Sequence, residues 1–156
     1  MTDAPIYLSD AKDALLAAVK RGESARCLCC NRLAKVYRRK MHATMGKFLC
    51  DLARTTFEKE REWIHVNELR PENGNYGMLR LWELARPANR RSGHANAHGL
   101  WSITPEGLRF AKGASKIKER VILFNGSPIG FDGEDVGIET VLGTRFSYAE
   151  LMAGVK

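Results

Sequence analysis

The apolar positions in the first half of the chain repeat at helical spacing in two segments. Residues 8–22 have one apolar side, with Ser9 suited to cap the helix start and Gly22 suited to a left-handed end. Residues 43–58 have a similar side, followed by a charged end. The apolar positions are Leu15, Leu16 and Val19 in the first segment and Met45, Phe48, Leu49, Leu52 and Ala53 in the second. Both segments are predicted to be packed helices.

The middle of the chain predicts shorter elements in close succession. Residues 63–66 have strand character, and Asn67 can cap a brief helix that Pro71 stops. A longer helix is expected over residues 74–84, before Pro87. Its buried face is predicted to consist of Met78, Leu81, Trp82 and Ala85.

A polar segment is followed by strong signals for a strand and a helix. Residues 88–99 are small, polar and basic, without apolar periodicity, and are expected to form a loop. Residues 100–103 are then predicted to be a strand. Thr104 can cap the helix that comes next, and Gly113 suits its end.

The last part of the chain predicts a hairpin and a helix. Two strand-like runs in residues 119–133 flank Asn125 and Gly126, which favour a tight turn, and Ser147 can cap the final helix. A chain of 156 residues suits one domain with small additions. The expected class is α+β, with an N-terminal helix and cysteine element in 1–42, a core in 43–113, and a hairpin and helix in 114–156.

The order of elements in residues 43–112 resembles a known fold. A strand that leaves a glycine-containing basic loop and enters "WSITPEGLRFA" is similar to the wing and last helix of winged helix-turn-helix regulators such as the MarR and PadR families. The resemblance implies a winged-helix core whose helix at 74–84 faces the major groove of DNA. The implied DNA contacts are Asn73, Asn75, Tyr76 and Arg80 from this helix and Arg90, Arg91 and His94 from the wing. The alternative for Arg80 is a solvated surface pair with Glu83.

The ends of the chain differ from those regulator families. The families usually dimerise through long terminal helices, whereas the ends here are a short helix with cysteines and a hairpin with an acidic tail. Two-fold operator binding therefore does not follow from the resemblance. The arrangement of CxxC, "KVYRRK", "LRLWEL", "LWSITPEG" and "VILFNG" also resembles a group of uncharacterised bacteriophage proteins, which implies no activity. A winged helix is equally compatible with protein binding, because a fold does not fix a function.

Charge is distributed unevenly. The net charge is +7, and residues 24–50 and 84–105 contain no acidic residue. Basic residues with an interleaved tyrosine suit contacts to phosphates. The candidates in the first segment are Arg32, Lys35, Tyr37, Arg38, Arg39 and Lys40. The alternative is a basic surface that is merely solvated.

Cysteines are concentrated in the first third of the chain. Cys27 and Cys30 have the spacing at which two thiolates hold one zinc ion, and Asn31 suits the left-handed residue such a turn needs. The candidates for the remaining ligands are Cys29, His94 and His98. The alternative is that the pair consists of small residues in a turn. Cys50 lies on the apolar side of its helix and is expected to be a core thiol.

The function expected from these observations is non-enzymatic. The chain has no nucleophile elbow, phosphate-cradling glycine loop or HExxH motif. It has no apolar run of membrane-spanning length and no basic start typical of a secretory signal, so a cytoplasmic protein is expected. We expect a winged-helix protein that binds double-stranded DNA and zinc, in phage or bacterial transcription regulation. The alternative is a phage-encoded inhibitor or adaptor that docks on a host nucleic-acid machine.

Overall fold

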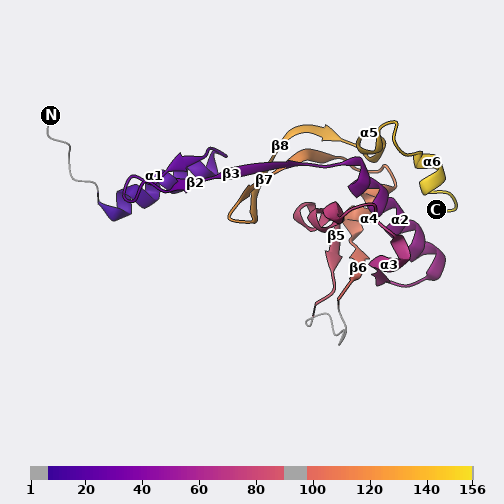
Figure 1. The fold of residues 1–156 in the computed structure, drawn as a ribbon. Helices are drawn as coiled ribbons and strands as arrows, with labels where there is room; N and C mark the ends of the chain where they lie inside the picture. Colours follow the sequence, from indigo (N-terminus) through magenta and orange to yellow (C-terminus); the bar gives the residue numbers. More distant parts are fainter. Residues whose placement is uncertain (1–6, 90–97, 156) are drawn as a thin grey trace. The chain divides into compact units, whose positions relative to one another are not determined.

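The computed structural model describes residues 7–89 and 98–155 and has mixed α+β secondary structure with antiparallel sheets (Figure 1). The α+β class is thus confirmed. The chain forms two compact units, each made from two stretches of sequence. Unit 1 consists of Met1–Lys40 and Arg120–Gly133, and unit 2 of Met41–Glu119 and Glu134–Lys156. The predicted segments were consecutive, whereas residues 114–156 are divided between the units.

Unit 1 begins with helix α1 (Leu8–Lys20), which starts before the predicted cap. Tyr7 is the N-cap, with an extended backbone, and its carbonyl accepts the N–H of Ala11 at 3.0 Å. Ser9 therefore lies inside the helix, and its prediction as the cap is wrong. The helix ends as predicted, because Gly22 adopts a φ of 76° and its N–H donates to the carbonyl of Val19.

Unit 1 also contains a two-stranded sheet and most of a three-stranded sheet, of which residues 117–119 and 134–136 belong to unit 2. β1 (Ala25–Arg26) and β2 (Leu33–Ala34) enclose the cysteine turn. β3 (Val36–Lys40) pairs antiparallel with β7 (Ile117–Phe124), which also pairs with β8 (Ser127–Val136). The β7–β8 turn is the predicted one, since Asn125 and Gly126 both have positive φ, at 52° and 76°.

Unit 2 is built around α2 (Ala43–Lys59), close to the predicted helix. Its apolar side is buried, and Met45, Leu49 and Leu52 have no exposed surface. Around it lie short elements. They are β4 (Ile64–His65), α3 (Val66–Leu69), a 3-10 helix η1 (Gly74–Trp82), β5 (Ala85–Pro87), β6 (Leu100–Ile103), α4 (Pro105–Ala111), α5 (Ile138–Leu142) and α6 (Tyr148–Leu151).

The β-sheet of unit 2 is antiparallel and has the order β4-β6-β5. Figure 1 shows β5 and β6 running side by side. β6 occupies the predicted residues 100–103, and the predicted caps Thr104 and Ser147 both accept backbone N–H groups, from Gly107 and Glu150. The predicted cap of the short helix is wrong, because His65 rather than Asn67 takes that role.

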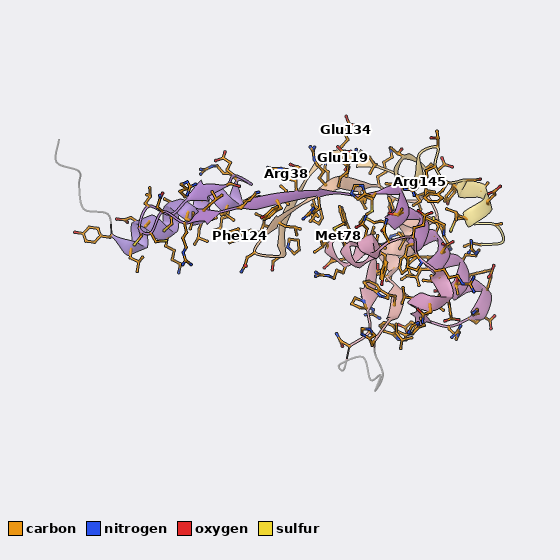
Figure 2. The ribbon with its side chains drawn as sticks, viewed as in Figure 1. Arg38, Met78, Glu119, Phe124, Glu134 and Arg145 are labelled. Carbon is orange, nitrogen blue, oxygen red and sulfur yellow. The ribbon has the colours of Figure 1, made fainter. Side chains whose placement is uncertain are left out.

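The predicted helix over residues 74–84 is a 3-10 helix instead of an α-helix. Two glycines within one turn, Gly74 and Gly77, weaken any α-helix at this place, and Glu83 ends the element with a φ of 57°. The tighter winding changes which residues point inward. Leu79 is fully buried, and the predicted Met78, which is labelled in Figure 2, is only half-buried.

The junction between η1 and α4 is close-packed. The hydroxyl of Thr104 donates to the carbonyl of Glu83 at 2.6 Å and accepts the N–H of Gly107 at 2.9 Å. A Cβ atom on Gly107 would lie 1.8 Å from the carbonyl oxygen of Leu84. The glycine of "ITPEG" thus permits a close backbone approach between the start of α4 and the segment that enters β5.

This contact predicts that Gly107→Ala lowers the free energy of unfolding of unit 2. Because the clash is with backbone, we expect the free energy of unfolding to fall by about 1–3 kcal/mol, the usual cost of overpacking. Denaturant unfolding measures it. Ala149→Leu, at an exposed position of α6, is the control and should have wild-type stability. An unchanged midpoint for Gly107→Ala would contradict the packing described here.

Candidate nucleic-acid interface

The basic run of unit 1 is divided between the two sides of β3. Side chains alternate along a strand, and Val36 marks the inner side because it is only 8% exposed. Tyr37 points to the other side and is 46% exposed. Lys35 and Arg39 flank its ring, with the Lys35 Nζ 4.9 Å and the Arg39 guanidinium carbon 5.9 Å from the ring centroid. These three side chains form one cationic and aromatic surface.

Arg38, labelled in Figure 2, follows Tyr37 and so lies on the inner side of β3, where it is hydrogen-bonded within unit 1. Its Nε donates to the Asp132 carboxylate at 2.7 Å, and its Nη2 donates to the carbonyl of Gly22 at 2.8 Å. Arg120 donates to the second oxygen of the same carboxylate at 2.9 Å. The hydrogen bond from Arg38, aided by Arg120, lowers the pKa of Asp132 below its ordinary value. Arg38 therefore joins α1, β3 and β8.

The predicted phosphate contacts thus fall into two groups. Lys40, like Arg38, has an interaction partner in the structure. Among the described residues, no carboxylate lies within ion-pair distance of Arg32, Lys35 or Arg39. Only the second group keeps its charge available to an external anion.

A groove of about 470 Å³ lies beside this available group. Arg32, Lys35 and Tyr37 line it, and Phe124 and Asn125 reach it from the β7–β8 hairpin. Cys27 and Cys30 also line it. The groove brings cations, aromatic rings and thiols of unit 1 to one place, which spacing along the sequence alone did not indicate.

The cysteine turn has a backbone geometry that stabilises a thiolate at one of its own cysteines. Asn31 has the predicted left-handed backbone, with a φ of 60°, and its N–H donates to the carbonyl of Cys27 at 2.8 Å. The N–H of Cys29 points to the Cys27 Sγ at 3.4 Å. Hydrogen bonding from the backbone N–H of Cys30, then of Cys29, lowers the pKa of Cys27. The turn therefore favours a thiolate at Cys27.

A complete metal site is not present in the part of the chain that the structure describes. There, no three His, Cys, Asp or Glu side chains are grouped so that they could hold a metal ion. Cys27 and Cys30 form a two-thiol half-site, and Cys29 contributes its backbone N–H. His98 is an exposed residue of unit 2, and His94 lies outside the described residues.

The predicted base-contacting residues have different environments. Asn73 accepts the N–H of Asn75 at 3.0 Å and so caps η1. The ring of Tyr76 stacks on Phe48, with centroids 4.6 Å apart. Arg80 is exposed on η1. Arg90 and Arg91, like His94, lie outside the described residues.

A second concavity, in unit 2, was not predicted from the sequence. It is an open cleft of about 930 Å³ between η1 and the ends of β4, β5 and β6. Tyr76 and Trp101 contribute aromatic walls, and Gly74 and Gly77 contribute bare backbone. Those two glycines, three apart in a segment expected to be helical, were the available signal.

Comparison with models of known protein families, with curated proteins and with solved structures finds no match to this chain. None of the helices in the described part of the chain has the length and apolar character needed to cross a membrane.

The thiols are expected to differ in reactivity. Cys27 should react with iodoacetamide at lower pH than an ordinary cysteine, because its lowered pKa makes the thiolate available earlier. Cys50 is fully buried, and burial raises its pKa to about 12, so it should be alkylated only on unfolding. Mass spectrometry of peptides after timed alkylation at several pH values measures both. Cys29, which is exposed, is the internal reference. Equal rates for Cys27 and Cys29 at every pH would contradict the turn geometry.

Proposed function

We propose that this protein is a non-enzymatic, winged-helix protein that binds double-stranded DNA. The observation that carries the proposal is the topology of unit 2. Its order of α2, β4, α3, η1, β5 and β6, with the antiparallel sheet order β4-β6-β5, supports a winged-helix assignment in which β5 and β6 flank the wing. In this assignment η1 takes the place of the recognition helix, and the exposed Arg80 on it is available to a base edge.

The basic surface of unit 1 supports the same proposal. Arg32, Lys35 and Arg39 present positive charge without a described acidic partner, as contacts to phosphates require. Tyr37, between two of the cations, adds an apolar face that suits sugar or base. These contacts carry no sequence information, so they would supply affinity, whereas unit 2 would supply any sequence preference.

The salt dependence of binding tests this division. Each phosphate contact contributes a slope of about −0.9 to log K against log [salt] for duplex DNA. The double variant Lys35→Ala/Arg39→Ala should therefore reduce the slope by about 1.8 and weaken binding to all sequences alike. Fluorescence anisotropy with a labelled duplex, over a range of salt concentrations, measures it.

A matched control removes the same charge elsewhere in unit 1. Lys12 and Lys20 are exposed on α1, and the double variant Lys12→Ala/Lys20→Ala should keep the wild-type slope. Equal losses in both double variants would mean that only total charge matters. If the wild-type protein does not bind duplex DNA at low salt, the proposal is wrong. Capture of a host protein that survives nuclease and high salt would then favour an inhibitor or adaptor.

Zinc is the proposed cofactor of the cysteine turn. Cys27 and Cys30 would hold it as thiolates, which the backbone N–H groups at the turn favour. A bound zinc ion would fix the turn between β1 and β2. Its remaining ligands are not among the described residues grouped around the turn.

The zinc proposal predicts a measurable metal content. Elemental analysis of the purified protein should find zinc, and Cys27→Ser/Cys30→Ser should lose it, because the pair supplies the thiolates. The control is Cys50→Ser, which removes the buried thiol of α2 and should leave the zinc content unchanged. Wild-type protein without zinc after purification and after incubation with added zinc would rule the cofactor out.

A further inference from the structure

The cleft of unit 2 has the form of a binding site for a flat ring. Its volume of about 930 Å³ lies within the range of small-molecule sites, roughly 300–1,000 Å³. One wall is the ring of Tyr76, and another is that of Trp101. Residues at the ends of β4 and β5 also line it.

The aromatic wall is held rigidly. Phe48 stacks on one face of the Tyr76 ring, with an angle of 18° between the ring planes. Trp101 meets Tyr76 edge-on, with centroids 5.6 Å apart and an angle of 82°. Trp101 also meets Phe48 edge-on, at 6.2 Å. Tyr76 is half-buried and lines the cleft, and Phe48 occupies one face of its ring, so a ligand that stacks on Tyr76 would use the other face.

The polar groups of the cleft suit a neutral heterocycle. Asn67 and His98 line it, and neither side chain has a hydrogen-bond partner among the described residues. A carboxamide and an imidazole can each donate and accept, as the edge of a base requires. None of the described residues that line the cleft is acidic, so a ligand that carries a phosphate would meet no carboxylate among them.

Two glycines leave room for this ligand. Gly74 and Gly77 are three residues apart in a 3-10 helix, where such positions lie above one another. A Cβ on either residue would meet no atom within 4 Å, so both open onto free space. Neither has a positive φ, so the backbone does not require glycine at these positions. The missing side chains widen the cleft.

We propose that this cleft binds an unpaired nucleobase, stacked on Tyr76 and contacted along its edge by Asn67 and His98. The inference rests on the proposed DNA binding and adds a preference for DNA in which one base is extruded from the duplex. The cleft lies at the ends of β5 and β6, which flank the proposed wing, and along η1, so a base that leaves the duplex at this site has a stacking surface.

The first experiment compares two duplexes of equal length, one fully paired and one with a single bulged adenine. Wild-type protein should bind the bulged duplex about tenfold more tightly, as expected for one stacked base. Gly77→Leu, whose added Cβ meets no atom within 4 Å, should remove this preference. Because Gly77 lies on η1, the proposed recognition element, the quantity compared is the ratio of the two duplex affinities within each variant. Asn67→Ala, an exposed residue, should reduce the preference and serves as a second variant if Gly77→Leu does not fold. Ala149→Leu is the matched control.

A second experiment measures the cleft without DNA. Deoxyadenosine monophosphate should bind the wild-type protein in equilibrium dialysis and bind Gly77→Leu at least tenfold more weakly. Equal affinity for both duplexes, with salt-dependent binding intact, overturns the inference but not the proposed function. Absence of duplex binding together with retained nucleotide binding overturns the proposed function and the preference for bulged DNA, and leaves only the binding of a nucleobase in the cleft. Nucleotide binding that is absent, or unaffected by Gly77→Leu and Asn67→Ala, overturns the inference.

Discussion

The carbonyl oxygen of Leu84 lies so close to the Cα of Gly107 that no side chain fits between them. This contact fixes the start of α4 against the chain that leaves η1. Thr104 reinforces it from both sides, through the carbonyl of Glu83 and the N–H of Gly107. β6 precedes Thr104 directly and β5 follows Leu84 directly, so the two strands are aligned at this end by the same contact. The position of Trp101, one wall of the cleft, depends on that alignment.

Signals that act over a few residues allowed much of the fold to be predicted. Features that depend on neighbours in sequence are confirmed. They are the caps at Thr104 and Ser147, the turn at Asn125 and Gly126, and the helix α2. Ser9 failed as a cap because Tyr7 is the N-cap, so α1 starts two residues earlier than expected. Periodicity also could not distinguish a 3-10 helix from an α-helix over nine residues, so Leu79 was missed as a core residue.

The candidate site was harder to predict, because it depends on partners far away in the sequence. Arg38 and Arg39 look equivalent in a basic run, yet strand alternation and the carboxylate of Asp132, 94 residues from Arg38, give them different roles. The groove beside Tyr37 needs Phe124, and the cleft in unit 2 needs β4, η1 and β6 together. The sequence showed that basic residues cluster. Only the ion pairs and hydrogen bonds of the structure show which of these residues have no described acidic partner and can bind an external anion.

The pairing of β3 with β7 has a consequence for synthesis on the ribosome. β3 is complete once Lys40 has been made, but its partner strand follows nearly all of the first stretch of unit 2. At about 5–20 residues per second, the interval between Arg38 and Asp132 is roughly 5–20 seconds. During that time β3 is an open strand edge, which in general invites pairing with other chains. Its consecutive cations, Arg38, Arg39 and Lys40, are side chains of the kind that discourages pairing at an open strand edge.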